Sequence, residues 1–511
     1  MPALPHLQTN SDLTTHLIVD DKPFVMLGGE LGNSTASSMD SLASVWPTVR
    51  QLHLNTVVSP VYWELMEPQE GRFDFTLVDQ LIEDARRNDI RLVLLWFGVW
   101  KNSMSTYVPA WVKQDGRRFP HAFDANGRPV EILSAFSSDT LAADVSAYTA
   151  LLRHLREIDG SRHTVLMVQI ENEIGFLGAA REHGPAADAA FAGAVPDALL
   201  HRLKRSGGTW SEVFGSDAAG EEIFMAWHYA RYVEALAAAG KAVYPLPVYV
   251  NAALNRPGRR PGEYPSAGPL PHLLDVWRAA APSVDLLCPD VYFFDFADWT
   301  EKYVGPGHPL FVPEAMRSSR AAANAMYAIG QQRAIGFSPF NVEAIDDPAN
   351  NLLGQAYSAM RFLMPKLLAP GSITFGLSPR VRADGTMDPT PQTIHVGDYT
   401  LSVKFDGVAA ANTPLVSFGG DPAIRGDTLP PSGGLIVFDG PDTYIVIGTG
   451  MRITHTHASG DQVGLLDVQE WTQQGDGWAP QRWLNGDQTN QGREVLLYGF
   501  GMQRVRLYRY R

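Results

Sequence analysis

The chain has 511 residues, which is enough for two to four domains or for one large barrel with an appended domain. Hydrophobic residues make up 45% and charged residues 19%, as in a globular protein with a large core. The formal net charge is −14, and the sequence has no run of Lys or Arg. This charge disfavours nucleic acid and an anionic membrane surface as partners.

The sequence carries no pattern of a membrane span or a disulfide framework. No stretch approaches about 18 consecutive apolar residues, so we expect no transmembrane helix. The first residues lack the basic and apolar regions of a signal peptide. We therefore expect a cytoplasmic location for the chain as written, and a periplasmic or secreted one if a leader has been removed. The single cysteine, Cys288, excludes an intrachain disulfide and a cysteine-based zinc site.

Short apolar runs alternate with segments of helical spacing through the first two thirds of the chain. The helical segments include residues 46–54, 77–89, 141–158 and 224–241. The runs are continuously apolar, which is typical of parallel strands buried on both faces. There are eight of them, and this number predicts a (β/α)8 barrel. The runs cover residues 24–30, 55–63, 91–100, 165–170, 247–252, 284–292, 309–315 and 334–343.

The pattern changes near Pro370. Beyond it, short strands with turn signals between them predict an all-β, sandwich-like domain. The strands expected there cover residues 399–405, 433–440, 443–450, 463–471 and 502–511. We therefore expect a catalytic barrel over residues 1–370 and a β domain over residues 371–511. The second domain has no cluster of catalytic residue types, so we expect it to brace the barrel.

Polar side chains follow the expected barrel strands, where barrel enzymes carry their chemistry. The fourth strand ends on Asn172 and Glu173, and the seventh ends on Glu314. The mouth is acidic and aromatic, with almost no Lys or Arg at the strand ends. It suits a neutral polyol better than a phosphate, which needs cations or backbone nests. Candidate substrate contacts are Asn172, Tyr292, Glu30, Asn251, Trp63, Trp100 and Trp299.

Two carboxylates facing each other across such a mouth are what glycosidic cleavage requires. One protonates the leaving oxygen, and the other attacks the anomeric carbon. We assign Glu173 as acid/base and Glu314 as nucleophile, with Tyr292 orienting Glu314. Side chains rising from opposite strands should bring the carboxyl groups to ~5–5.5 Å, the separation of a retaining enzyme.

The same residues resemble a known family. "QIENEIG" (169–175), "VPAWV" (108–112) and "VPEA" (312–315) are similar to motifs of glycoside hydrolase family 35 β-galactosidases, and "YWELMEPQEGRFDF" (62–75) resembles a segment shared by families 35 and 42. The resemblance implies a β-galactosidase-like enzyme of the clan of retaining (β/α)8 glycosidases. We expect an exo-acting enzyme without cofactor or metal that acts on oligosaccharides or polysaccharide-derived β-galactosides. "LWFGVWKN" (95–102) lacks the carboxylate that family 35 carries there, and the segment 176–225 is unusual, so the chain resembles a divergent branch.

Other functions stay open from the sequence. The glycon could instead be that of a β-glucosidase, β-mannosidase or α-L-arabinosidase. A Mg²⁺-dependent lyase or isomerase could use Glu173, Asp290 and Glu314 as ligands, although no base of Lys or His type stands at a strand end. A sugar-binding protein without catalysis ranks last, because both carboxylates are present. Association into a homo-oligomer is also left open.

Overall fold

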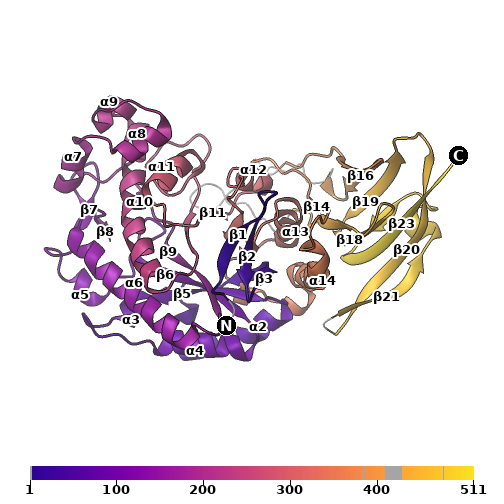
Figure 1. Cartoon of the computed structure of the whole chain (residues 1–511), viewed down its shortest axis with the longest axis horizontal. Helices are drawn as coiled ribbons and strands as arrows, with labels where there is room; N and C mark the ends of the chain where they lie inside the picture. Colours follow the sequence, from indigo (N-terminus) through magenta and orange to yellow (C-terminus); the bar gives the residue numbers. More distant parts are fainter. Residues whose placement is uncertain (1–2, 384–385, 409–428, 476) are drawn as a thin grey trace. The chain divides into compact units, whose positions relative to one another are not determined.

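The computed structural model describes residues 3–383, 386–408, 429–475 and 477–511 (Figure 1). Eight strands form a closed barrel in which successive strands lie side by side and the last closes on the first. The printed pairings between them are parallel. The barrel strands are β4 (Met26–Glu30), β5 (Thr56–Tyr62), β6 (Arg91–Lys101), β9 (Val165–Asn172), β10 (Val248–Ala252), β11 (Leu286–Val291), β12 (Phe311–Ala315) and β13 (Gly336–Pro339). The predicted (β/α)8 fold is confirmed.

The chain divides into two compact units. The first comprises Met1–Phe24, Glu30–Trp46 and Asn55–Asp290. The second comprises Val25–Gly29, Pro47–Leu54 and Val291–Arg511.

Helices alternate with strands through the first unit, as the hydrophobic spacing predicts. Side chains cap the two longest helices: Ser137 accepts a hydrogen bond from the Thr140 N–H at the start of α6, and Asp217 accepts one from the Gly220 N–H at the start of α10. The helices are α1 (Met39–Ala43), α3 (Trp63–Met66), α4 (Thr76–Arg87), α5 (Ala110–Lys113), α6 (Ser138–Asp159), α7 (Pro185–Phe191), α8 (Asp197–Leu203), α9 (Trp210–Phe214), α10 (Ala218–Val243) and α11 (Leu274–Ala280). Helix α2 (Trp46–Gln51) begins with the last residue of one segment of the first unit, and its other residues belong to the second unit.

Two small sheets in the first unit were not anticipated from the sequence. One consists of β1 (His6–Thr9), β2 (Thr15–Val19) and β3 (Lys22–Phe24), and the other of β7 (His121–Phe123) and β8 (Pro129–Leu133). Their strands are short, and a run of three to five residues carries little periodicity.

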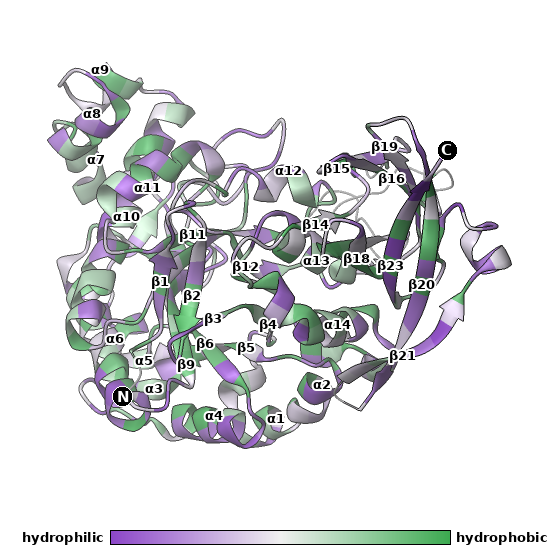
Figure 2. Cartoon of the chain, turned by 45° about the vertical axis from the view of Figure 1, so that its right-hand side comes forward, coloured by the Kyte–Doolittle hydropathy of each residue, from purple (hydrophilic) through white to green (hydrophobic). Residues whose placement is uncertain are grey.

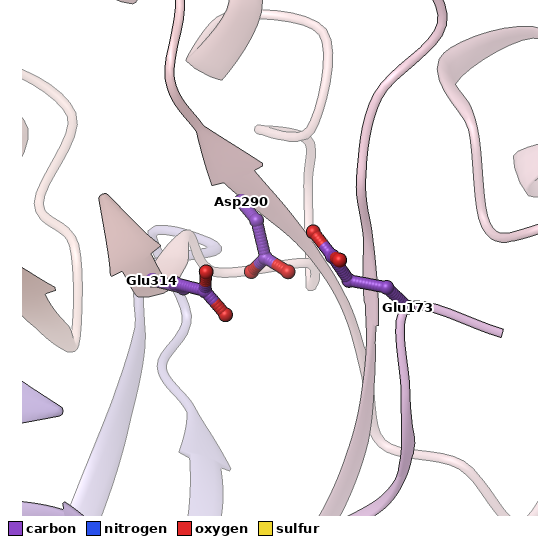
Figure 3. Close-up of side chains that lie close together, drawn as sticks. All are labelled: Glu173, Asp290 and Glu314. Atoms are coloured by element: carbon purple, nitrogen blue, oxygen red, sulfur yellow. The ribbon is translucent and has the colours of Figure 1, made fainter. Parts of the chain in front are cut away.

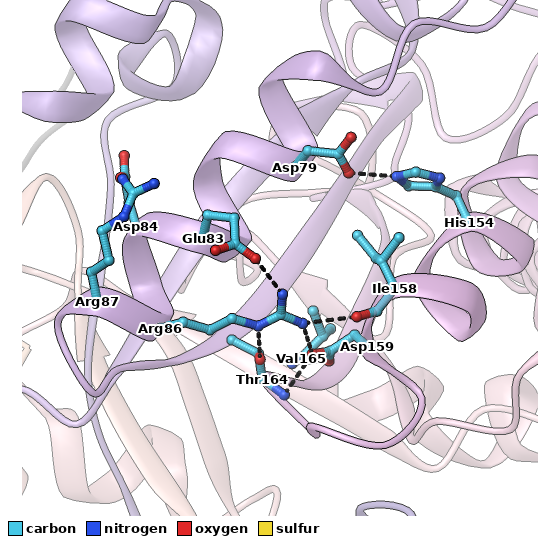
Figure 4. Close-up of polar contacts among 10 residues, drawn as sticks. All are labelled: Asp79, Glu83, Asp84, Arg86, Arg87, His154, Ile158, Asp159, Thr164 and Val165. Carbon is cyan, nitrogen blue, oxygen red and sulfur yellow. Dashed lines mark hydrogen bonds and ion pairs between the residues drawn. The ribbon is translucent and has the colours of Figure 1, made fainter.

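Arg86 ties α4 to the end of α6 and the start of β9 (Figure 4). Its guanidinium donates to Asp159 Oδ1 at 2.7 Å, to the Ile158 carbonyl at 2.9 Å and to Thr164 Oγ1 at 3.0 Å. Asp159 is fully buried and also accepts the backbone N–H groups of Thr164 and Val165. Since a buried carboxylate needs a compensating charge or donors, this pair holds the base of the barrel together.

Arg86→Met should lower the free energy of unfolding by about 3–5 kcal/mol, because it leaves the Asp159 carboxylate buried without its counter-charge. Urea unfolding at pH 7 measures the change. The control is Arg202→Ala, whose partner Asp275 is half exposed, as Arg202 is itself; that loss should stay within about 1 kcal/mol. Equal losses for the two variants would contradict the importance given to Arg86.

In the second unit, two antiparallel sheets share one hydrophobic core. The larger runs in the order β14-β17-β18-β23-β20-β21 and the smaller in the order β15-β16-β19-β22. Core residues come from both sheets, including Ile436 and Val446 from the first and Leu401 and Ile453 from the second. Strands β20 and β23 carry alternating hydrophilic and hydrophobic bands (Figure 2), as expected when one face of a sheet is buried. The sandwich-like β domain predicted from the sequence is therefore present.

The strands of these sheets extend beyond the five segments expected from the sequence. They are β14 (Thr374–Leu377), β15 (Gln392–Val396), β16 (Tyr399–Phe405), β17 (Gly433–Phe438), β18 (Thr443–Thr449), β19 (Met451–His457), β20 (Gln462–Gln474), β21 (Gly477–Leu484), β22 (Val495–Leu497) and β23 (Gly501–Tyr510). Helices α12 (Phe296–Thr300), α13 (Ala321–Gln331) and α14 (Leu352–Leu367) complete the unit.

Helix α13 packs directly against β14 and β17. A Cβ at Gly330 would come within 2.2 Å of Leu435 and 3.0 Å of the Gly376 nitrogen, so only glycine allows this approach. Thr374 Oγ1 donates to the Gly330 carbonyl at 2.8 Å, and Arg320 donates to Ser378 Oγ at 2.6 Å. These contacts join the β sheets to a helix that follows barrel strand β12.

Across the described residues, every helix falls short of the length and apolar character that a membrane span requires. Cys288 is a free, buried thiol on β11.

Candidate active site

Strand β9 leads Glu173 into the mouth of the barrel. All eight of its residues are buried, from Val165 to Asn172. The backbone then leaves the extended conformation, because Glu171 has a φ of 59° and Glu173 a φ of 47°. Non-glycine residues with a positive φ are uncommon, and they cluster at functional sites, where the backbone must hold a side chain in one orientation. Glu173 is 6% exposed, and its N–H donates to Asn251 Oδ1 at 2.9 Å.

The end of β6 runs alongside the end of β9. The Trp100 N–H donates to Glu171 Oε2 at 2.8 Å, and Lys101 Nζ donates to Asn172 Oδ1 at 2.7 Å. Asn102 Nδ2 donates to Glu173 Oε2, and the hydroxyl of the next residue, Ser103, donates to the Glu173 carbonyl at 2.9 Å. We call residues Trp100–Ser103 the β6 arm.

Lys101 fixes the orientation of the Asn172 amide. Because the Asn172 oxygen accepts from Lys101, the Nδ2 group is left as a buried donor without a partner among the described residues. Such an amide can donate to a hydroxyl oxygen of a bound sugar.

Asn251 connects β9 to β11. While its oxygen accepts from Glu173, its Nδ2 donates to Asp290 Oδ2 at 2.6 Å. Asp290 is 1% exposed at the end of β11, and the Asn251 amide supplies a neutral donor to this buried oxygen.

Glu314 lies at the end of β12 and is 4% exposed. The Tyr292 hydroxyl donates to Glu314 Oε1, as predicted from the sequence. A phenol that donates to a carboxylate favours its ionised form, which is the form needed for attack.

One oxygen from each of Glu173, Asp290 and Glu314 lies within 4.8 Å of the other two, and the three side chains point toward one another (Figure 3). This spacing would also suit a cation. However, Asn102, Asn251 and Tyr292 each place a neutral donor on one of these carboxylates. Each of these donors fixes the orientation of one carboxyl group.

Glu171 faces away from this group and meets Asp144 of α6 in the protein interior. The two buried carboxyls interact electrostatically, and burial of two like charges side by side favours a proton on one of them. Asp144 also accepts from the Trp96 indole at 2.8 Å and from the Tyr232 hydroxyl at 3.0 Å. Burial raises the pKa of Asp144 to about 6, and burial, with the neighbouring Asp144 charge, raises the pKa of Glu171 well above its usual range.

This proton should make stability depend on pH. In the unfolded chain both carboxyls ionise above about pH 4.5, whereas the folded pair keeps its proton. The stability contributed by that proton is complete below the unfolded pKa and falls as pH rises toward the folded pKa, by about 1.4 kcal/mol per pH unit. Glu171→Gln mimics the protonated carboxyl and should remove this loss. Unfolding free energies measured at pH 4.5, 5.5 and 6.5 should therefore show that the variant becomes more stable relative to the wild type as the pH rises.

The control for this experiment is Glu157→Gln on the exposed face of the same helix, α6. It should keep a constant difference from the wild type across the pH range. A constant difference for Glu171→Gln as well would contradict the shared proton.

The three tryptophans expected to stack on sugar lie inside the protein. Trp63 is 0% exposed and packs against Trp96 and Trp111, with its indole N–H on Glu67. Buried rings whose neighbours already cover them offer no face for a sugar. This placement argues against the stacking role in each case. Trp100 is likewise enclosed by Tyr229 and Tyr232, and Trp299 by Phe293 and Lys302.

Glu30 is buried at the end of β4, where the sequence placed it. Sequence reasoning missed Lys101 and Asn102. It noted only that no carboxylate stands at this position, and it described the mouth as almost free of Lys. The available signal was a Lys-Asn pair directly after an apolar strand. Asp144 was missed because a carboxylate in an amphipathic helix usually faces solvent.

Two family models match separate parts of the chain. A model described as beta-galactosidase matches residues 39–221, which include β5, β6 and β9. A domain of unknown function, DUF5597, matches residues 353–496, from α14 to β22. The similarity to β-galactosidases thus covers residues 39–221 of this chain.

The individual relatives are distant. The β-galactosidase GalA of Bacillus licheniformis is 28% identical over 143 residues, which are 27% of this chain and 19% of GalA. Gan42B, a GH42 β-galactosidase from G. stearothermophilus, superposes with a TM-score of 0.52 at 11% identity, over 95% of this chain and 98% of that one. The β-galactosidase from Bacillus circulans sp. alkalophilus gives 0.48 at 12% identity, over 67% and 57% of the two chains. The similarity to Gan42B shows that the fold is shared.

Proposed function

We propose that this protein is a retaining, exo-acting hydrolase of β-galactosides. The observation that carries the proposal is the group of buried carboxylates in which Glu173 and Glu314 meet. An oxygen separation within 4.8 Å is compatible with the short carboxyl spacing of retaining enzymes, ~5–5.5 Å, whereas inverting enzymes space their carboxyl groups ~6.5–9.5 Å apart.

In the first step Glu314 attacks the anomeric carbon while Glu173 gives its proton to the glycosidic oxygen. The bond to the leaving group breaks, the leaving group departs as a neutral alcohol, and a covalent glycosyl ester forms on Glu314. In the second step Glu173, now ionised, takes a proton from water, whose oxygen attacks the same carbon. The ester bond breaks, and the sugar leaves with its original β configuration.

The protein groups around the pair fit these roles. Tyr292 holds Glu314 in position for attack, and the Asn172 amide offers a donor to a sugar hydroxyl. Asn251 and Glu30 stay as proposed sugar contacts. The beta-galactosidase model over residues 39–221 and the name of GalA support galactose as the glycon. A panel of nitrophenyl glycosides would distinguish it from glucose, mannose and arabinose.

Replacing the nucleophile should nearly abolish turnover. Glu314→Ala is expected to lower kcat by about 10⁴-fold or more, because no group remains to form the covalent ester. Added azide should occupy the vacated space and restore turnover of an activated aryl galactoside, giving the α-galactosyl azide. NMR of the wild-type product identifies the anomer released first. Release of the α anomer, or azide rescue that gives a β azide, would contradict the assignment.

The effect of replacing the acid/base should depend on the leaving group of the substrate. Glu173→Gln should slow a substrate with a poor leaving group by ~10²–10⁴-fold, the usual value of general acid catalysis, and affect glycosylation by an activated aryl galactoside far less. Steady-state kcat/KM with methyl and dinitrophenyl β-galactosides tests this. An equal loss on both substrates would remove Glu173 from the role.

The same three carboxylates support the second candidate, a Mg²⁺-dependent lyase or isomerase, through their spacing. Glycosidase activity that persists in EDTA would dismiss it.

A further inference from the structure

The β6 arm contacts the end of β9 residue by residue. Trp100 contacts Glu171, Lys101 contacts Asn172, and Asn102 contacts Glu173. A main-chain bond from the Asn102 N–H to the Asn172 carbonyl, at 3.2 Å, lies between them. The two segments therefore form a matched pair of short chains, fastened both through the backbone and through side chains.

This pairing persists although the backbone is strained on both sides. Asn102 and Ser103 have φ values of 54° and 57°, facing Glu171 and Glu173 at 59° and 47°. Non-glycine residues in the left-handed region cost roughly 1–3 kcal/mol each and persist only where the surroundings determine them strongly. Such clusters occur where a side chain must be held in one orientation.

Within the arm, only the Asn102 side chain reaches the carboxylate of Glu173. Trp100, Lys101 and Ser103 bind neighbouring residues or the Glu173 main chain. Removal of the Asn102 amide would thus keep the hydrogen bonds that Trp100, Lys101 and Ser103 make to β9 and its end. It would mainly change the environment of Glu173 Oε2.

An amide N–H can only donate, so it binds the oxygen that carries no proton. When Glu173 is protonated, Oε2 must act as the carbonyl oxygen, and the proton is placed on Oε1. No described residue hydrogen-bonds to Oε1, so that oxygen is left to meet the substrate. We infer that Asn102 is a positioning residue that directs the transferable proton of Glu173 to Oε1, an inference that rests on the proposed acid/base role.

The test compares Asn102→Ala and Asn102→Asp with the wild type. For methyl β-galactoside, kcat/KM should fall by about 10–100-fold in both variants, a part of the ~10²–10⁴-fold that general acid catalysis supplies. For dinitrophenyl β-galactoside, which leaves without a proton, it should change by less than about 3-fold. KM should change little, because the loss lies in proton delivery.

Asn102→Asp adds a readout that loosened packing would not give. The charged groups near Glu173 are Asp290 and Glu314 across the mouth and Lys101 on the arm. The added carboxylate beside Oε2 should disfavour loss of the catalytic proton as the pH rises. The alkaline limb of the kcat/KM profile should therefore move to higher pH. Asn102→Ala should not produce this displacement.

Ser105→Ala is the matched control. Its hydroxyl donates to the Lys101 carbonyl at 3.1 Å, within the same loop, without reaching β9. It should leave both substrates and the pH profile unchanged. Equal losses on the two galactosides in the Asn102 variants, with an active wild type and an unchanged melting temperature, would overturn the role of Asn102 alone. A wild type that hydrolyses neither galactoside would overturn the proposed function, and the role of Asn102 with it.

Discussion

Carboxylates buried at the ends of parallel strands must find hydrogen-bond donors, and this need organises the region around β6, β9 and β11. Taking a carboxylate out of water costs several kcal/mol unless charge or hydrogen bonds compensate it. Within the part of the chain that the structure describes, the compensation recorded at Glu171 and Glu173 comes from neutral donors, the Trp100 N–H and the Asn102 amide. Neutral donors hold a carboxyl in place while leaving it free to exchange a proton.

The buried pair of Glu171 and Asp144 is the second consequence of this need. Their recorded donors are an indole and a phenol, with no cation on them among the described residues, and burial therefore favours one retained proton on the pair. Glu171 also accepts a hydrogen bond from the Trp100 N–H, so the pair helps to hold the first residue of the β6 arm. The proposed acid/base thus lies two residues from a buried carboxyl that accepts a hydrogen bond from the β6 arm.

The barrel could be predicted because its strands are continuously apolar and end on polar residues. Glu173 and Glu314 followed from this pattern and from the requirements of glycosidic cleavage. Strand alternation would place Glu171 and Glu173, two residues apart, on the same side, but it does not apply where the backbone turns to positive φ. What could not be predicted were contacts between elements: Asp144 with Glu171, and Lys101 with Asn172. The aromatic residues show the same limit, since a tryptophan at a strand end can face the mouth or, like Trp63, the helices.

In the β domain, strands with strong apolar character were recognised and half-exposed ones were not. Strand β16 matches the expected segment 399–405, whereas β21, with most of its residues exposed or half-exposed, gave no signal. The close approach of α13 to β14 and β17 depends on Gly330. A lone glycine near the end of a helix equally predicts a cap, so its packing role emerges only from the three-dimensional arrangement.

The one-to-one match between the β6 arm and the end of β9 limits how this protein can evolve. Adding or deleting one residue between Trp100 and Ser103 would shift every partner by one position and place a different side chain against Glu173. A substitution in the arm changes one contact at a time, whereas a change in its length changes all of them together. Variation in loop length, the usual source of new specificities in barrels, should therefore concentrate after Ser103 and within the segment from α7 to α9.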